Sequence, residues 1–221
     1  DLKSMEIFAN IQDFRENARF SQKSKIFHEI QNFCKEEKIR LIEDNAQGML
    51  STLGKRQLGT FSDFSVTSFQ TTKVVACGEG GLIMGKNPDE VDQLREYIFY
   101  GRDNSNGLFY INESGNFKLS EMNAALALAD LERSSYRIQR RREIDQKYKG
   151  FVNSKFFNFL KNPSSNNTSN YKTIFIAKRE EIREKIEIHF KKNNVAMTGY
   201  VYKIPLHLQP RIFNNKNFVK R

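Results

Sequence analysis

The sequence predicts an α/β fold in which helices flank a mostly parallel sheet, followed by a second, smaller α/β domain. Short apolar or β-branched runs alternate along the chain with longer segments whose apolar residues recur at helical spacing. A polar stretch at residues 162–170 separates this series from a shorter strand and helix series. The expected domains are therefore residues 1–150, which end in a long helix, and residues 151–221.

The first expected elements are a helix and a buried strand. Residues 24–38 place apolar side chains such as Phe27, Ile30 and Cys34 at helical spacing, with charged residues between them. Residues 39–44, IRLIED, form a short apolar run that ends in two acids, which is typical of a buried strand with polar groups at its carboxyl end. A helix followed directly by such a strand favours a parallel sheet.

Two further strands and two helices follow. Residues 64–69, FSVTSF, are β-branched and aromatic, and residues 80–85, GGLIMG, enter a strand through glycine turns. Residues 87–102 open with Asn-Pro and acidic residues, as helix N-termini do. From Leu119 to about Tyr148 neither proline nor glycine interrupts the helical pattern, so we expect one long helix, with Ser120 and the nearby Glu121 as its cap.

The smaller domain is predicted from the end of the chain. A strand is expected at residues 171–177, an amphipathic helix at residues 179–194 and another short strand near Val195. This order gives the smaller domain a strand–helix–strand core.

The charge of the chain narrows its partners. Its 221 residues include 36 Lys and Arg against 26 Asp and Glu, a net charge of +10. Such an excess favours a polyanion, which leaves nucleic acid, a membrane surface and a phosphorylated small molecule as alternatives. The densest basic cluster, residues 133–142, lies inside a helical pattern, where a solvated helix face is the simplest explanation. No apolar run reaches the ~20 residues of a membrane span, so no membrane partner is expected.

The cysteines and histidines predict no metal site. Cys34 and Cys77 lie far apart and form no CxxC pair, so neither a zinc site nor a disulfide framework is expected, and the cytoplasm is the expected location. The three histidines are too scattered along the chain for a ligand cluster.

Polar side chains follow two of the predicted strands at their carboxyl ends, where ligand sites of parallel α/β sheets gather. Asp44 and Gln47 follow the first strand, and Ser68 and Lys73 follow the second. Each residue alone is commonly a turn former or a solvated charge. If both strands lie in one sheet, however, a carboxylate and an amine converge on one pocket. Such a set suits pyridoxal 5'-phosphate, which needs a lysine for its aldehyde, a carboxylate for its ring nitrogen and hydroxyls for its phosphate.

Several segments, taken in order, resemble the DegT/DnrJ/StrS family of pyridoxal-phosphate-dependent sugar aminotransferases, which have the aspartate-aminotransferase (type I) fold. The segments are LIEDNAQGM, LGTFSDFSVTSFQTTKVVACGEGGLIMG, YGRD, GNFKLSEMNAALALADLER, RRREIDQKY and YKIPLHLQP. The resemblance runs from about Ile39 to Pro210. It implies an enzyme of amino-sugar biosynthesis that transfers an amino group, with glutamate as the expected donor, to a nucleotide-linked keto sugar.

The resemblance gives roles to the polar residues at the strand ends. Lys73 matches the Schiff-base lysine, and Asp44 matches the carboxylate that pairs with the pyridine nitrogen. Gln47 matches the residue beside the phenolic oxygen of the cofactor. Ser68 matches a phosphate ligand.

Two more residues gain roles in the same way. Asn116 matches an asparagine that reaches the phosphate of the partner subunit's cofactor, which implies a homodimer with shared active sites. His207 lies where the family approaches the substrate. Lys118 stands where the family commonly has an arginine, which puts any bidentate contact there in doubt. The family's N-terminal phosphate loop and stacking aromatic are not recognisable before Ile39, and the end of the small domain is missing, so we expect a fragment.

Two other functions stay open. One is a sugar dehydratase with the same cofactor, in which a histidine replaces the lysine, so Lys73 favours the aminotransferase. The other is a non-catalytic, basic regulatory or nucleic-acid-binding protein on the same fold. The expected partners are a nucleotide sugar and an amino acid rather than nucleic acid.

Overall fold

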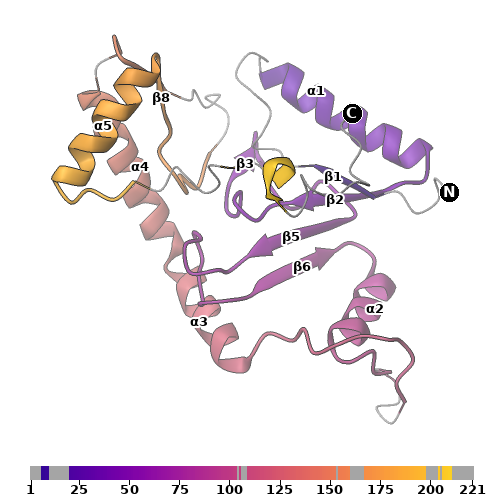
Figure 1. The fold of residues 1–221 in the computed structure, drawn as a ribbon. Coiled ribbons are helices and arrows are strands. Elements are labelled where there is room, and N and C mark those ends of the chain that lie inside the picture. Colours follow the sequence, from indigo (N-terminus) through magenta and orange to yellow (C-terminus); the bar gives the residue numbers. More distant parts are fainter. Residues whose placement is uncertain are drawn as a thin grey trace. The chain divides into compact units, whose positions relative to one another are not determined.

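The computed structural model describes residues 6–9, 20–103, 105, 109–152, 154–159, 167–197, 204 and 206–210. The chain divides into two compact units (Figure 1). Unit 1 consists of Asp1–Val152 and Phe159–Phe175, and unit 2 of Asn153–Asn158 and Ile176–Arg221.

A four-stranded sheet with the order β1-β2-β5-β6 forms the centre of unit 1 (Figure 1). Its strands are β1 (Glu6–Ala9), β2 (Arg40–Asp44), β5 (Phe64–Ser68) and β6 (Gly81–Gly85). The first three run parallel, and β6 runs antiparallel to β5. The connection from β5 to β6 contains no helix, and a return without a helical crossover is typical of an antiparallel pair. The sheet is therefore mostly parallel, as the sequence predicts.

One face of this sheet packs against α1 (Phe20–Glu36), which runs along β1 and β2 in Figure 1. The buried side chains Phe27, Cys34, Leu41 and Phe61 form the core on this face. The rings of Phe27 and Phe61 meet edge to face, with their centroids 4.9 Å apart. The helix predicted from apolar spacing is thus confirmed, and it begins four residues earlier than expected.

The same face buries a carboxylate, Glu43, which is only 1% exposed. Its oxygens accept hydrogen bonds from the backbone N–H groups of Gly59 and Phe61. Burial raises the pKa of the Glu43 carboxyl, although these two hydrogen bonds oppose the shift. Ser65 lies opposite Glu43 in the strand register, and its buried hydroxyl has no hydrogen-bond partner among the described residues. Glu43 therefore holds residues 59–61 against the sheet.

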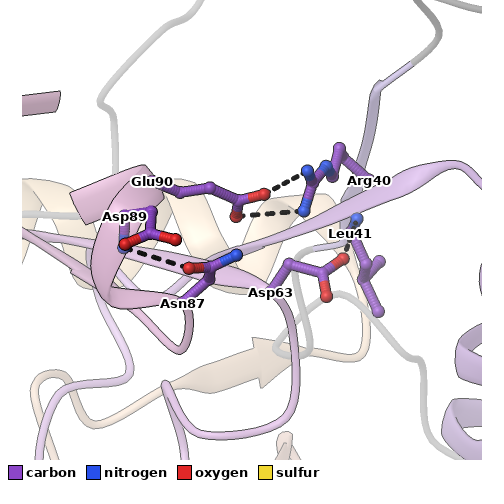
Figure 2. Close-up of polar contacts among 6 residues, drawn as sticks. All are labelled: Arg40, Leu41, Asp63, Asn87, Asp89 and Glu90. Carbon is purple, nitrogen blue, oxygen red and sulfur yellow. Dashed lines mark hydrogen bonds and ion pairs between the residues drawn. The ribbon is translucent and has the colours of Figure 1, made fainter. Parts of the chain in front are cut away.

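The amino-terminal end of the sheet is held by polar contacts (Figure 2). The guanidinium of Arg40 pairs with both carboxylate oxygens of Glu90, in the first turn of α2 (Pro88–Ile98). The carboxylate of Asp63 accepts a hydrogen bond of 2.9 Å from the backbone N–H of Leu41. These contacts join α2 and the segment before β5 to the start of β2.

Two helices begin at the caps that the sequence predicts. The side chain of Asn87 accepts a hydrogen bond of 3.0 Å from the N–H of Asp89 at the start of α2, as Figure 2 shows. Ser120 accepts one of 3.2 Å from the N–H of Asn123. The helix α2 ends earlier than predicted, at Ile98, because the following residues turn through left-handed conformations.

The predicted long helix consists of two helices, α3 (Glu121–Glu132) and α4 (Ser134–Phe151). The expectation of one uninterrupted helix is wrong at Arg133, where ψ is −3°. Serines follow this break, and serine favours helix ends over interiors. The side chain of Arg137 also donates to the backbone carbonyl of Asp130, at 3.4 Å, in the last turn of α3.

Small sheets accompany the main one. β3 (Thr52–Leu53) and β4 (Arg56–Gln57) form an antiparallel hairpin in unit 1. β7 (Phe157–Phe159) and β8 (Phe175–Ala177) form a second pair. β8 is shorter than the strand predicted for residues 171–177.

Unit 2 contains α5 (Glu180–Lys192), which was predicted, and the 3-10 helix η3 (Leu206–Leu208). The strand predicted near Val195 is wrong for the described residues. Asn194 adopts a left-handed φ of 55°, and the N–H of Val195 donates to the carbonyl of Phe190 at 2.9 Å. The backbone there closes the helix rather than a strand ladder. Within the described part of the chain, no helix is both long and apolar enough to cross a membrane.

Candidate functional site

Asp44 and Ser68 lie at the carboxyl ends of neighbouring strands and on the same face of the sheet. Asp44 pairs with Val66 in the parallel register of β2 and β5, and Ser68 follows two residues later. Because side chains alternate along a strand, Asp44, Val66 and Ser68 point away from the face that packs against α1. Asp44 and Ser68 are both half-buried. The convergence of the two strand ends, predicted from the sequence, is therefore present.

Lys73 lies in the loop that joins β5 to β6, which we call the lysine loop (residues 69–80). The loop folds back on itself through backbone hydrogen bonds of 2.8 Å from Phe69 to Gly80, from Thr71 to Gly78 and from Lys73 to Gln70. Its two ends therefore stay together at the edge of the sheet, next to Ser68, which pairs with Gly81.

The lysine loop is anchored by apolar packing. The buried residues Phe69, Val75, Cys77 and Ala127 form a cluster, so the loop packs directly on α3. The turn that contains Gln47 contributes Met49 and Leu50 to the same cluster. Val75 belongs to this cluster, and its neighbour Val74 is also buried. The residues directly after Lys73 thus contribute apolar side chains and no polar group.

An ion pair fixes the backbone on both sides of Val75. Asp130 in α3 accepts a hydrogen bond of 2.8 Å from the N–H of Ala76. Arg137 in α4 donates to the carbonyl of Val74 at 2.7 Å and to the carboxylate of Asp130, also at 2.7 Å. Asp130 and Arg137 therefore hold the backbone directly after Lys73.

The amine of Lys73 faces an aromatic ring. Its Nζ atom lies 5.4 Å from the centroid of the Tyr171 ring, within the range of a cation–π contact. The hydroxyl of Tyr171 lies 3.1 Å from the Thr72 hydroxyl. Across the part of the chain that the structure describes, the Lys73 amine forms no ion pair. Its side chain is half-buried.

The groups at this edge fit the chemistry of pyridoxal phosphate. Asp44 accepts one hydrogen bond, from the N–H of Ala46 to Oδ1 at 3.0 Å, so Oδ2 has no partner among the described residues. Ser68 accepts a hydrogen bond of 3.3 Å from the N–H of Gln70, which leaves its O–H available to donate. An amine, a carboxylate oxygen and a hydroxyl are the groups that this cofactor needs for its aldehyde, ring nitrogen and phosphate.

The other predicted site residues lie elsewhere or are less defined. Gln47 is exposed in the turn after β2. Asn116 is exposed and pairs with Phe99 through an isolated bridge, while Lys118 holds its amine 3.8 Å from the Phe99 ring centroid. His207 belongs to η3 in unit 2, and its side chain lies outside the described residues. Asp44, Ser68 and Lys73 are thus the predicted residues that the sheet brings to one edge.

Sequence reasoning missed the residues that support Lys73 from a distance, namely Tyr171, Asp130 and Arg137. The basic cluster at residues 133–142 was interpreted as a solvated face, yet three of its arginines bind backbone carbonyls. Arg137 donates to Val74, Arg141 to Tyr171 at 3.0 Å and Arg142 to Thr168 at 3.1 Å. The density of arginine was the available signal, but its partners lie 26 to 63 residues away.

Comparisons with known proteins identify the family of the chain. The family model of the DegT/DnrJ/EryC1/StrS aminotransferase family matches residues 23–221. The dTDP-4-dehydro-2,3,6-trideoxy-D-glucose 4-aminotransferase of Saccharopolyspora spinosa is 27% identical over 195 residues, which are 82% of this chain and 50% of that protein. The chain thus spans about half the length of this relative.

Solved structures show the same fold. A DegT DnrJ EryC1 StrS aminotransferase from Brucella abortus superimposes with a TM-score of 0.75 at 21% identity, covering 85% of this chain and 49% of that one. The PLP form of Spr1654 from Streptococcus pneumoniae gives a TM-score of 0.73 at 20% identity, covering 95% and 57%. The predicted type I fold is therefore confirmed, and the chain belongs to the DegT/DnrJ/EryC1/StrS aminotransferase family.

Proposed function

We propose that this chain is part of a pyridoxal-phosphate-dependent aminotransferase of amino-sugar biosynthesis. Its reaction transfers an amino group, with glutamate as donor, to a keto sugar linked to a nucleotide. The observation that carries the proposal is that Asp44 and Ser68 end neighbouring parallel strands and that the loop of Lys73 follows Ser68, in a chain of this family. The Saccharopolyspora relative, an aminotransferase of a dTDP-linked sugar, supports the substrate class.

Four residues of this chain would hold the cofactor. Asp44 would keep the pyridine nitrogen protonated through its available Oδ2, and Ser68 would donate a hydrogen bond to the phosphate. Gln47 would lie beside the phenolic oxygen, and the amine of Lys73 would bind the aldehyde. When bound, the cofactor supplies a ring that accepts the electrons of the bond broken at the substrate carbon.

Lys73 has a second task in the proposed reaction. Once its amine is free, Nζ would take a proton from the substrate carbon and later return it to the reacting centre. Such a transfer would require the amine to stay within hydrogen-bond reach of both positions of the proton. The anchored lysine loop supports this role, because Asp130 and Arg137 fix the backbone directly after Lys73.

The alternatives receive less support. A dehydratase on the same fold carries a histidine in place of the lysine, and this chain has Lys73. A nucleic-acid-binding protein needs exposed arginines for phosphates. Three arginines of the densest basic cluster instead bind carbonyls of their own chain. The remaining excess of positive charge suits an anionic nucleotide sugar, and two free, buried cysteines suit the reducing cytoplasm.

We propose further that the protein acts as a two-fold dimer with shared sites, in which Asn116 reaches the partner's cofactor. Exposed apolar side chains surround Asn116 in the chain, and clustered exposed aromatics mark interaction surfaces. They are Tyr97, Phe109, Tyr110, Ile111 and Phe117. The rings of Tyr97 and Phe117 stack with centroids 6.0 Å apart, which gives this surface a flat aromatic platform.

Mixing inactive subunits tests the dimer. In the protein at its full natural length, Lys73→Ala and Asn116→Ala subunits should each be inactive alone. Hybrid dimers contain one site with both residues intact, so mixing after partial dissociation should restore part of the activity. Mixed samples without activity, in which mass spectrometry detects hybrid dimers, would exclude the shared site.

Borohydride trapping tests the function itself. In the full-length protein with cofactor, reduction should fix pyridoxyl label on Lys73 and on no other lysine, because only an imine reduces to a stable amine. The same preparation should aminate at least one nucleotide-linked keto sugar with glutamate as donor. Lys118→Ala serves as the matched control and should retain the label on Lys73. Label on Lys55 or Lys118 in the wild-type protein would refute the assignment.

A further inference from the structure

Tyr171 contacts the lysine loop from a distant part of the chain. Its hydroxyl lies 3.1 Å from the Thr72 hydroxyl, across a separation of 99 residues. Its ring lies beneath the amine of Lys73, with 5.4 Å from Nζ to the ring centroid. Thr72 is itself oriented, because its N–H and O–H both donate to the side-chain oxygen of Gln70, at 2.9 and 2.7 Å. Tyr171 therefore touches the lysine and its neighbour together.

The segment that carries Tyr171 is fixed within unit 1 by contacts other than those of its ring with Lys73. The N–H of Ser169 donates to the hydroxyl of Ser51 at 2.9 Å, and both serines are buried. Thr52 and Asn167 exchange two hydrogen bonds, of 2.7 and 3.2 Å. We call residues 167–171 the docking segment. Its backbone position is determined by these contacts and does not depend on Lys73.

Arginines of α4 complete the fixation of the docking segment. Arg142 donates to the carbonyl of Thr168 at 3.1 Å, and Arg141 donates to the carbonyl of Tyr171 itself at 3.0 Å. The side chain of Tyr171 is half-buried. A ring held at its own backbone and at its hydroxyl has little freedom to turn away from the amine.

We propose that Tyr171 is a positioning residue that holds the charged Lys73 amine when this amine is not bound to cofactor. The inference rests on the proposed function of Lys73. An ammonium over an aromatic face is attracted by the negative charge of that face, so the ring holds the amine in place whenever it carries a proton. During the proposed transfer, Nζ carries the substrate proton between its removal and its return. Tyr171 keeps this ammonium beside the lysine loop over that interval.

The same ring has a second cationic neighbour. The amine of Lys172 lies 5.1 Å from the Tyr171 centroid, and Lys172 is exposed. Two ammonium groups at one ring repel each other, so Lys172 weakens the hold on Lys73. Lys172→Gln should therefore preserve or strengthen the contact, whereas removal of the ring should abolish it.

Amine labelling of the cofactor-free protein tests the proposal independently of catalysis. The full-length protein would receive short pulses of an acetylating ester at fixed pH, and mass spectrometry would give the ratio of label on Lys73 to label on exposed Lys55. Tyr171→Leu should raise this ratio about two- to fivefold, the factor that corresponds to a cation–π contact of about 0.5–1 kcal/mol. Tyr171→Phe keeps the ring and should keep the ratio near that of the wild type.

The controls distinguish the loss of the ring contact from a general loosening of the structure. Tyr136→Leu removes an exposed tyrosine of α4 and should leave the ratio unchanged. Because Lys55 serves as internal reference, differences in reagent dose between samples cancel in the ratio. An unchanged ratio in Tyr171→Leu, or an equal rise in Tyr171→Phe and Tyr171→Leu, would overturn the proposal.

Kinetics give the second readout. In the loaded enzyme Tyr171→Leu should lower kcat and leave KM for the amino donor within about twofold, because the ring acts on the lysine rather than on donor binding. Tyr171→Phe should recover most of kcat. A rise of KM without a fall of kcat would contradict the positioning role. Failure of borohydride to label Lys73 would instead refute the proposed function and would leave the labelling ratio as a valid measure of the ring contact.

Discussion

The two ends of the central sheet use charged residues differently. At the amino-terminal end, Arg40 pairs with Glu90, and Asp63 accepts the N–H of Leu41 (Figure 2). At the carboxyl end, Asp44 keeps one carboxylate oxygen without a partner among the described residues, and the Lys73 amine faces only the ring of Tyr171.

The charged residues at the amino-terminal end stabilise the fold, whereas those at the carboxyl end remain available to a ligand. A carboxylate and a guanidinium that satisfy each other join two elements and leave nothing for a ligand. A carboxylate and an amine held apart on anchored backbone retain the capacity to bind a third molecule. The same residue types therefore serve the fold at one end of β2 and the proposed chemistry at the other.

Neutralising one carboxylate at each end of the sheet tests this difference in role most directly. Asp44→Asn should lower turnover by about 100- to 1000-fold, because a neutral amide cannot hold the ring nitrogen protonated. Steady-state transamination by the full-length protein measures this effect. Circular dichroism should show an unchanged fold.

Asp63→Asn is the matched control, because the amide oxygen can still accept the N–H of Leu41. Its turnover should stay within about threefold of the wild type. Similar turnover losses in Asp44→Asn and Asp63→Asn would remove the distinction between the two ends.

Removal of the Asp130 side chain should weaken the attachment of the lysine loop to α3 and α4. Asp130→Ala leaves the N–H of Ala76 without its acceptor and removes one of the acceptors of the Arg137 guanidinium, which should cost about 1–3 kcal/mol in the free energy of unfolding. Urea denaturation measures the loss. Hydrogen exchange at the Ala76 amide should accelerate more than exchange within β2.

An exposed pair gives the reference for this experiment. Asp92 pairs with Arg95 on the surface of α2, where both side chains are more than half exposed. Asp92→Ala should change the free energy of unfolding by no more than about 0.5 kcal/mol. Equal losses in the two variants would show that Asp130 does not anchor the lysine loop.

The buried carboxylate of Glu43 should make the free energy of unfolding depend on pH. Burial raises the pKa of its carboxyl in the folded chain, so folding favours the protonated form. Its contribution to stability is therefore complete below the pKa of the unfolded chain and is lost as the pH rises through the higher folded value. The loss amounts to about 1.4 kcal/mol for each unit of pKa shift.

Glu43→Gln removes this titration and keeps the shape of the side chain. Urea unfolding from about pH 4 to pH 8 should show the wild type losing stability relative to this variant as the pH rises. A wild type that gains relative stability over the same window would contradict the direction of the shift.

The smallest effect is expected at the Arg40–Glu90 pair. The Arg40 side chain is 55% exposed, so solvent screens the pair, and a double-mutant cycle should give a coupling of at most about 1 kcal/mol. Arg40→Gln and Glu90→Gln should both leave turnover unchanged. The cycle should weaken further in high salt. A coupling above about 2 kcal/mol would show that the amino-terminal end contributes more to stability than its exposure allows.

Local patterns were sufficient to predict most elements of unit 1. The apolar spacing of α1, the short run of β2 and the caps at Asn87 and Ser120 are all written within a few neighbouring residues. β1 was missed because its four residues, EIFA, carry too short a signal. The break at Arg133 was missed because the side-chain contact beside it involves Arg137 and is tertiary.

The residues of the candidate site likewise fall into those that local sequence reveals and those that depend on tertiary contacts. Asp44, Ser68 and Lys73 are recognisable because strand ends and their following loops are local features of the sequence. Tyr171, Asp130 and Arg137 were not recognisable, since they meet the lysine loop across 54 to 99 residues. Parts of a site that depend on tertiary packing leave no periodic pattern in the chain.

The hydrogen bond between Ser51 and Ser169 closes a loop across 118 residues. The entropy lost in closing a loop of that length exceeds that of a loop of about 12 residues, such as the lysine loop, by about 2 kcal/mol. The docking segment should therefore reach its place late in folding, after the lysine loop has closed. Until then Lys73 lacks its aromatic neighbour, although the pairing of β2 with β5, which carries Asp44, does not require that segment.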